Sequence, residues 1–426
     1  MTPPAGARTT TVPRAAEGYP RTMNAHPAEA PLPGPPDPWS STDMPPRRDG
    51  PPYHMTDMIR AEPGLARRLL TRLATPGGAA AALAVAVRTA AVAGRPIHVV
   101  GCGTSEHGAL ATAEILRHAA RVAGLPSAIG AGGAPVAVQA FEAALEASQP
   151  GPGGLVIAIS HEGATWATNR ALVAARAAGA TTAVVTASAA SPAAGLADVI
   201  VETDELDQSW CHTVGYLSPI LAAAAVGAHL SGTPIGAAAA AGLLGHGLEG
   251  GPEAATTALA GSLAGVDRLL VVGSGTDRIA ARELALKLEE GAHLPASMHD
   301  LETLLHGHLA GVDGRTGLVL LLAERVGRDA RTARALGMLR AAREIGLPVG
   351  AILADIVALE VDPALTPAGR IAVPDAAGLA GPVGTLLATA VPLQLLTERL
   401  AIARGVDPDP IRRDEPRYLA AAAAAE

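Results

Sequence analysis

Aromatic side chains are scarce in this 426-residue chain: they make up only 2% of it, although 49% of the residues are hydrophobic. Alanine supplies much of that fraction, so we expect cores of Ala, Val and Leu in which helices lie close to sheets. The chain has only two cysteines, Cys102 and Cys211. Two such residues make neither a disulfide framework nor a CxxC site. We therefore expect a protein of the reducing cytoplasm.

Long basic runs and long uninterrupted apolar runs are also missing. The chain has 32 Lys and Arg against 40 Asp and Glu, a net charge of −8, and its basic residues form only short pairs. This balance argues against a nucleic-acid partner. The Ala-rich stretch 219–245 is interrupted by Gly, Pro and His, so we expect packed helices there rather than a membrane span.

The first 52 residues have no hydrophobic periodicity. Their proline-rich segments, PLPGPPDP and PPRRDGPP, are incompatible with the interior of a helix or a sheet. The segment also lacks the apolar core of a signal peptide. We predict that residues 1–52 form a disordered tail and that the folded protein begins near Met55.

Helical and strand patterns alternate from residue 55 onwards. In the first half, helices are expected at 55–94, 105–124, 136–147, 165–179 and 212–230, and strands at 97–101, 126–130, 155–160, 181–187 and 199–203. After a linker and entry helix at 232–262, strands are expected at 268–273, 317–323, 348–354 and 371–374, with helices around Glu290 and at 329–346 and 381–405. Short apolar strands that alternate with helices indicate parallel sheets covered on both faces.

An internal repeat accompanies this alternation. Residues 99–119 align with residues 271–291 at an offset of 172, which favours two copies of one unit over a single large sheet. We predict two doubly wound, flavodoxin-like α/β domains in tandem, at residues 53–235 and 236–426.

The stretch 271–313 holds several chemical groups. A strand, the glycine turn Gly273–Thr276 and a helix follow one another, an order that presents free backbone N–H groups to an anion. The helix carries Lys287 and Glu290 on one face, and His306 follows in a loop. Two alternatives stay open: Lys287 can be only the helix ion-pair partner of Glu283, and either Glu290 or its neighbour should face solvent.

The first half contains two comparable turns, 101–105 and 160–165. A GxG turn alone fits a tight βα loop as well as a binding loop, and Ser or Thr there often only cap helices. Neither turn has the third glycine of a dinucleotide site or a Walker lysine. Both are expected at the carboxyl edge of one sheet, where open α/β sheets bind ligands. Their hydroxyls and N–H groups suit a sugar or a sugar phosphate.

Four motifs together resemble those of the tandem sugar isomerase (SIS) proteins, and in particular the isomerase half of the glucosamine-6-phosphate synthases. They are CGTS at 102–105, S-x-x-G-x-T at 160–165, ALKL-x-E at 285–290 and L-x-HG-x-LA-x-x-D at 304–313. The resemblance runs from residue 53 to the C-terminus. It implies a homodimer that works without metal or other cofactor.

The resemblance also implies roles for individual residues. Glu290 takes the place of the base that moves a proton between C1 and C2. His306 takes that of a histidine implicated in ring opening, which in relatives arrives from the partner subunit, and Lys287 lies near the same sugar. Such enediol chemistry needs a carboxylate and a second proton-passing group. The substrate-binding positions are Gly103, Thr104, Ser105, Ser160, His161, Glu162 and Thr165.

A metal site is the alternative reading of the polar cluster that includes His306. Its members would be His293, His299, Asp300, Glu302, His306 and His308. We do not favour it, because the cluster lacks the HxxxH helical spacing and the relatives need no metal.

Three departures from the family pattern bear on function. Glu162 stands where relatives have a phosphate-binding serine, so it either points to solvent or marks an unphosphorylated or amino-bearing sugar. Ala421 stands near the place of the lysine that forms an imine with the ketose. The nearby Arg412, Arg413 and Arg417 either form an exposed basic tail, which is the interpretation we favour, or include one residue that replaces the charge of that lysine. Residues 1–52 cannot fold a glutaminase domain.

We therefore expect an aldose–ketose isomerase that acts on a sugar phosphate or amino-sugar phosphate, with deamination as a further step open to it. The enzymatic alternative is a deglycase or an ammonia-dependent aminotransferase. The alternative of another class is a non-catalytic sugar-phosphate sensor, which would bind the sugar and leave it unchanged.

Overall fold

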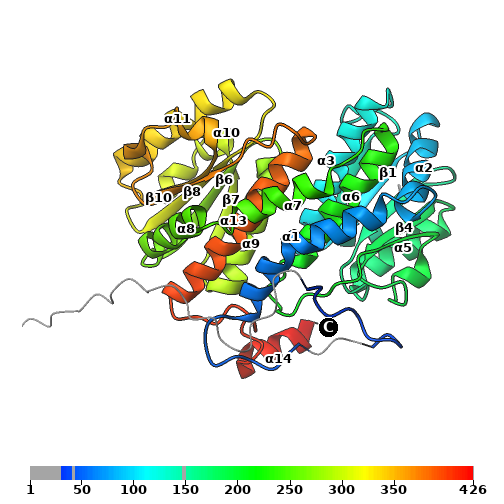
Figure 1. Cartoon of the computed structure of the whole chain (residues 1–426), viewed down its shortest axis with the longest axis horizontal. Helices are drawn as coiled ribbons and strands as arrows, with labels where there is room; N and C mark the ends of the chain where they lie inside the picture. Colours follow the sequence, from blue (N-terminus) through cyan, green and yellow to red (C-terminus); the bar gives the residue numbers. More distant parts are fainter. Residues whose placement is uncertain (1–29, 41–43, 146–149, 426) are drawn as a thin grey trace, which may run out of the picture.

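The computed structural model describes residues 30–40, 44–145 and 150–425. Two lobes, each built on one five-stranded sheet, are joined by long helices that run between them (Figure 1). Strands β1 to β5 all precede residue 235 and β6 to β10 all follow it. The expected fold class, two doubly wound parallel α/β domains, is confirmed.

The first sheet has the order β2-β1-β3-β4-β5, and all its strands are parallel. Alternate strand residues face opposite layers: Val99 and Ile157 belong to a core shared with α3 and α6, whereas Val100 and Ala158 face α5. This is how a sheet covered on both faces buries an almost continuous apolar strand. The elements are α2 (Ala79–Val92), β1 (Ile97–Gly101), α3 (Thr104–Val122), β2 (Pro135–Gln139), α4 (Ala140–Leu145), β3 (Leu155–Ile159), α5 (Trp166–Ala177), β4 (Thr181–Thr186), η1 (Ala194–Leu196), β5 (Val199–Glu202) and α6 (Val214–Ser231).

The second sheet repeats this topology with the order β10-β9-β8-β6-β7. When the second sheet is read from its β7 edge, both sheets have the same order, 2-1-3-4-5, where each number is the position of the strand in the chain. The elements are α8 (Gly250–Leu263), β6 (Arg268–Gly273), α9 (Asp277–Ala292), β7 (Ala296–Asp300), α10 (Leu301–Leu304), η2 (His308–Gly311), β8 (Thr316–Leu322), α11 (Arg328–Ile345), β9 (Val349–Ala354), α12 (Asp355–Ala358), η3 (Pro363–Leu365), β10 (Gly369–Val373) and α13 (Gly381–Ala403).

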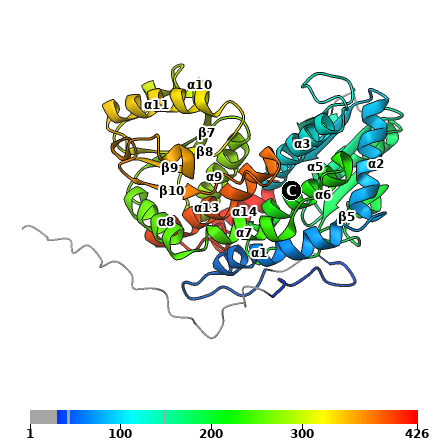
Figure 2. The same cartoon turned by 45° about the horizontal axis from the view of Figure 1, so that its top comes forward.

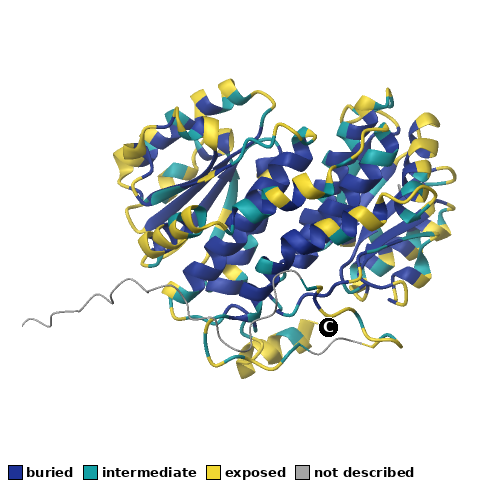
Figure 3. Cartoon of the chain, viewed as in Figure 1, coloured by how far each residue is buried: buried dark blue, intermediate teal, exposed yellow. Residues whose placement is uncertain are grey.

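The two lobes share one hydrophobic core. Helix α1 (His54–Leu73) packs against α6 and α7 (Ala237–His246), while α13 packs against α7, α8 and α9. Figure 3 shows the buried positions as continuous runs along these central helices. Among the described residues, α6 and α13 are long and apolar enough to span a membrane, but most of each helix is buried inside the fold.

Two edge strands differ from the sequence-based expectation. We expected a strand at 126–130 and a helix across 136–147; instead residues 135–139 form β2 and α4 covers only 140–145. Strand β7 was not predicted at all. Each strand follows the helix that comes directly after the first strand of its domain, and each pairs with one neighbour only.

The predicted N-terminal tail lies partly outside the described residues. Residues 30–40 and 44–52 contain no helix or strand, but they contact the first domain. The amide of Leu32 donates to Glu205 at 2.9 Å, and Arg48 pairs with Asp57 at 2.7 Å. Figure 2 shows this segment running beneath α1. The disordered tail and its boundary at residue 52 stay predictions.

Candidate active site

A cavity of about 260 Å³ opens where the carboxyl ends of β1 and β3 face the second domain. It is built from the two turns of the first domain, the loop before α6, helix α9 and the C-terminal tail. Its lining residues are Cys102, Gly103, Thr104, Ser105, His161, Glu162, Thr165, Trp210, His212, Glu290, Ile411 and Arg413. The fold thus brings seven of the ten predicted site residues to one place.

The turn after β1 requires glycine at position 101 and has open space beside position 103. A Cβ atom on Gly101 would lie 2.2 Å from the Ser105 carbonyl oxygen, so only glycine fits there. Gly103 has a φ of +57°, and a Cβ atom on it would meet nothing within 4 Å. The space beside Gly103 is therefore open to a ligand, whereas the Ser105 and Glu106 amides already donate to the Cys102 and Gly103 carbonyls at 3.1 and 2.9 Å.

Glu290 reaches the cavity from α9 of the second domain, and Lys287 lies behind it. The Lys287 Nζ donates to Glu290 Oε2 at 2.5 Å and lies 3.6 Å from Glu283 Oε1. Burial alone would lower the pKa of Lys287, but Glu290 and Glu283 outweigh it and raise that pKa above its usual range. This residue is the only lysine of the chain, and it is fully buried.

Glu283 connects this group to the first domain. His107 Nδ1 lies 2.6 Å from Glu283 Oε2, and the Thr104 hydroxyl donates to Oε1 at 3.4 Å. Burial would raise the pKa of Glu283, but Lys287 and His107 bring it below its ordinary value. A chain of alternating charge and hydrogen bonds therefore joins α9 to α3 behind the cavity. The helix ion pair we considered for Lys287 exists together with its contact to Glu290.

Two histidines lie side by side on the opposite wall. The Asp207 amide donates to His161 Nε2 at 3.2 Å, and the Asp207 carboxylate accepts the first N–H groups of α6. The ring of His212 lies 5.8 Å from that of His161. Burial lowers the pKa of His212, and its Nε2 has no hydrogen-bond partner in the described part of the chain.

His212 and Trp210 were not predicted as site residues. They belong to SWCHT, a loop after the last strand of the first sheet, which matches none of the motifs used above. Trp210 is one of only three tryptophans in a chain with few aromatic residues. A tryptophan beside a cysteine and a histidine in such a loop was the available signal.

The C-terminal tail forms the last wall. The carboxylate of Asp409 accepts the amides of His54 and Met55 at 2.9 and 3.0 Å, where α1 begins. The Arg413 guanidinium then lies 3.8 Å from the ring centre of Trp210. Of the three arginines considered as a replacement for the missing lysine, Arg413 alone is among the lining residues. Ala421 lies further on, in the exposed helix α14 (Pro416–Ala425).

The turn at 273–276, which we expected to cradle an anion, is already filled. The Thr276 amide donates to Glu324 Oε2 at 2.9 Å, and a Cβ atom on Gly275 would lie 2.9 Å from Glu324 Cγ. Arg331 hydrogen-bonds Ser274 beside it. A carboxylate from the loop after β8 occupies the cradle, so the prediction of an open binding turn there is wrong.

Within one chain, His306 is not brought to Glu290. Its side chain is 70% exposed and pairs with Glu302 at 2.8 Å, and it is not among the lining residues.

Ser160 is buried, and its hydroxyl has no hydrogen-bond partner among the described residues. The part of the chain that the structure describes contains no group of three or more His, Cys, Asp or Glu side chains arranged to hold a metal ion.

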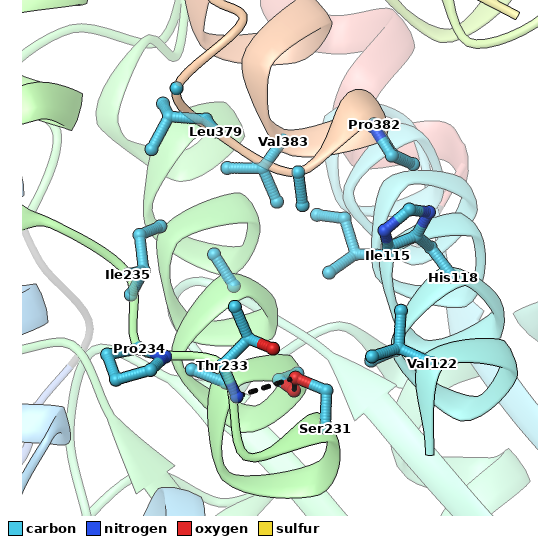
Figure 4. Close-up of a pocket in the computed structure, with 16 residues that line it drawn as sticks. Ile115, His118, Val122, Ser231, Thr233, Pro234, Ile235, Leu379, Pro382 and Val383 are labelled. Carbon is cyan, nitrogen blue, oxygen red and sulfur yellow. Dashed lines mark hydrogen bonds between the residues drawn. The ribbon is translucent and has the colours of Figure 1, made fainter. Parts of the chain in front are cut away.

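A second cavity, of about 200 Å³, lies between the lobes (Figure 4). Its walls are mostly apolar and include Ile115, Val122 and Val383, and His118 is the only titratable side chain among its lining residues. Burial lowers the pKa of His118. No carboxylate is among the lining residues of this cavity, whereas Glu162 and Glu290 line the first one.

The model of the SIS domain family matches two segments, residues 135–228 and 262–346. The glutamine–fructose-6-phosphate aminotransferase (isomerizing) of Gloeobacter violaceus is 26% identical over 341 residues. The match covers 76% of this chain and 51% of that protein, so the chain spans about half the length of this relative.

Solved structures share the fold. The C-terminal domain of glucosamine-fructose-6-phosphate aminotransferase from Francisella tularensis has a TM-score of 0.70 at 18% identity, over 85% of this chain and 99% of that one. Tagatose-6-phosphate ketose/aldose isomerase from Escherichia coli has a TM-score of 0.65 at 18% identity, over 87% and 98%. One match to the SIS domain model therefore falls in each of the two parallel-sheet domains.

Proposed function

We propose that this protein is an aldose–ketose isomerase whose base is Glu290. The observation that carries the proposal is the placement of this carboxylate in a cavity lined by hydroxyls and an open glycine turn. In the proposed reaction, Glu290 removes the proton from C2 of the open-chain aldose. The resulting enediol receives the proton at C1, and the ketose forms.

The neighbours of Glu290 favour this role. Lys287 binds one carboxylate oxygen, Oε2, and leaves the other to carry the proton. Thr104, Ser105 and Thr165 would hydrogen-bond the sugar, together with the N–H groups of the β1–α3 turn.

A second proton-passing group is needed for the ring and carbonyl oxygens. We assign this role to His306 from a partner subunit, which makes the working unit a homodimer. The exposure of His306 in the single chain is compatible with this arrangement. We also propose a cytoplasmic location and no metal or other cofactor.

The names of the relatives refer to fructose 6-phosphate and tagatose 6-phosphate. We propose a sugar phosphate or an amino-sugar phosphate as the substrate, with deamination as a further step. An unphosphorylated or amino-bearing sugar is the alternative that Glu162 raises. A deglycase or ammonia-dependent aminotransferase is the alternative, although an imine between a lysine and the ketose is disfavoured because the only lysine is buried. A non-catalytic sensor would have no need of the base.

Proton NMR in D2O tests the proposal. The wild type, Glu290→Gln and the neighbouring control Glu289→Gln would each be incubated with fructose 6-phosphate, glucosamine 6-phosphate and their unphosphorylated forms. We expect deuterium to enter C1 or C2 with the wild type and the control but not with Glu290→Gln. If no sugar exchanges although binding is measurable, the isomerase reading fails and the sensor takes its place.

A further inference from the structure

Glu162 and Glu324 occupy equivalent positions in the two domains. Glu162 comes four residues after Ala158, and Glu324 comes four residues after Leu320. Ala158 and Leu320 pair with repeat-equivalent valines of β1 and β6. Each glutamate therefore leaves the sheet at the same register, directly beside the glycine turn of its own domain.

In the second domain, both oxygens of the Glu324 carboxylate accept hydrogen bonds from backbone amides. One oxygen of Glu324 accepts the Thr276 amide at 2.9 Å, and the other accepts the Val326 amide at 2.8 Å. The Glu324 carboxylate thus takes the place that a bound anion would have at the glycine turn of its domain. A carboxylate at this register satisfies the N–H groups that would otherwise bind a ligand anion.

In the first domain, the equivalent carboxylate of Glu162 accepts no hydrogen bond from the glycine turn beside it in the described part of the chain. The turn at Gly103 is open, and Glu162 lines the cavity beside it. No hydrogen bond or ion pair joins Glu162 to another residue in the described part of the chain. The carboxylate of Glu162 is therefore available to a group of a ligand in this cavity.

The charges around the cavity decide which group fits. Glu162 and Glu290 are both among the lining residues, and Arg413, which lies over Trp210, is the only lining arginine or lysine. The positive charge of Lys287 is committed to the two carboxylates beside it. A phosphate dianion at the turn between β3 and α5 would meet a like charge, whereas an ammonium group would form charge-assisted hydrogen bonds.

We propose that Glu162 binds the ammonium group of an amino sugar, and that the substrate carries no phosphate at the β3–α5 turn. The inference rests on the proposed function in taking the ligand to be a sugar. It narrows the substrate class to an amino sugar whose positive charge lies next to α5.

Isothermal titration of the full chain with four sugars tests this. The sugars are glucose, glucosamine, glucose 6-phosphate and glucosamine 6-phosphate, and the proteins are wild type, Glu162→Gln and Glu162→Ser. We expect wild type to bind glucosamine at least about tenfold more tightly than glucose, the effect of one charged hydrogen bond, and more tightly than glucosamine 6-phosphate. Glu162→Gln should lose the preference for the amine, and Glu162→Ser should gain affinity for both phosphorylated sugars.

Glu106→Gln is the matched control, because Glu106 lies in the first turn of α3 but not among the lining residues. It should keep the wild-type preference. The proposal is overturned if wild type prefers the phosphorylated sugars, if Glu162→Gln keeps the amine preference, or if no sugar binds. Deuterium exchange separates the two proposals: amine binding through Glu162 without exchange would refute only the isomerase, and exchange that is independent of Glu162 would refute only this inference.

Discussion

At the scale of single residues, the neighbours Glu289 and Glu290 have different surroundings. Glu290 lines the cavity, whereas Glu289 is exposed and accepts the Ala296 amide at 3.3 Å. Successive helical residues point about 100° apart, so the sequence could predict that one of them faces solvent. It could not predict which, because the rotation of α9 is set by its packing against β6, β7 and α13, and to a lesser extent against α3.

The buried position of Lys287 leads to a stability prediction. Lys287→Met would leave Glu283 and Glu290 without their shared cation, and breaking a buried ion pair costs about 3–5 kcal/mol. We expect the free energy of unfolding, measured with urea, to fall by about this amount. Glu289→Gln on the exposed face should change it by less than about 0.5 kcal/mol. Equal stability of Lys287→Met and wild type would contradict the assigned charge network.

Asp277 gives a prediction about pH. Its Oδ2 accepts the amides of Ala323 and Glu324 at 2.8 and 2.9 Å, and burial raises its pKa to about 7. In the unfolded chain this carboxyl loses its proton near pH 4. Between these values only the folded state holds the proton, so Asp277 makes the protein less stable as the pH rises from about 4 to about 7, by up to about 1.4 kcal/mol per pH unit.

Asp277→Asn removes this titration. The stability of the variant relative to wild type, from urea unfolding at several pH values, should increase from about pH 4 to about pH 7 and then level off. Because both proteins share every other titrating group, the difference isolates Asp277. A flat difference across that range would show that the folded-state pKa is not raised.

At the scale of elements, the central strands were predictable and the edge strands were not. Central strands such as β3 and β8 are buried along their whole length, so they appear as short apolar runs. Strand β2 has mostly half-buried residues and runs directly into α4, which made residues 136–147 resemble one helix. Strand β7 contains His299 and Asp300 and has no apolar run.

The filled turn of the second domain leads to a prediction at this scale. Glu324→Ala would leave the amides of Thr276 and Val326 without their acceptor, at a cost of about 1–3 kcal/mol. The vacated cradle lies beside Arg331, so inorganic phosphate should bind there. We expect added phosphate to raise the melting temperature of Glu324→Ala more than that of wild type.

Glu344→Ala is the control for this experiment, since Glu344 is an exposed residue of α11. It should respond to phosphate as wild type does. If phosphate has the same effect on all three proteins, the carboxylate of Glu324 is not standing in for a ligand anion.

At the scale of the whole molecule, the repeat and its topology could be derived from the sequence, but the complete cavity could not. Motif spacing predicted the turns at 101–105 and 160–165 because each follows a strand. The contributions of His212 and Arg413 depend on the packing of a loop and a tail that carry no periodic pattern. Their place is fixed by tertiary contacts, such as those of Asp409 with the start of α1.

The proposed homodimer can be tested by subunit mixing. If His306 completes the site of its partner, His306→Ala and Glu290→Gln should each be inactive as homodimers. Coexpression of the two variants should restore part of the deuterium exchange, because one site of the mixed dimer then has both groups. Full exchange by His306→Ala alone would instead assign the second proton-passing role to a residue within the chain, and His212 lines the same cavity.

The single buried lysine has one more consequence. Open-chain sugars condense with exposed amino groups, and lysine side chains are the usual targets of such glycation. Here Lys287 is covered by the fold and held by two carboxylates. Under the proposed function, the protein therefore offers its sugar no accessible lysine amine, and an adduct would form at that side chain only after the chain unfolds.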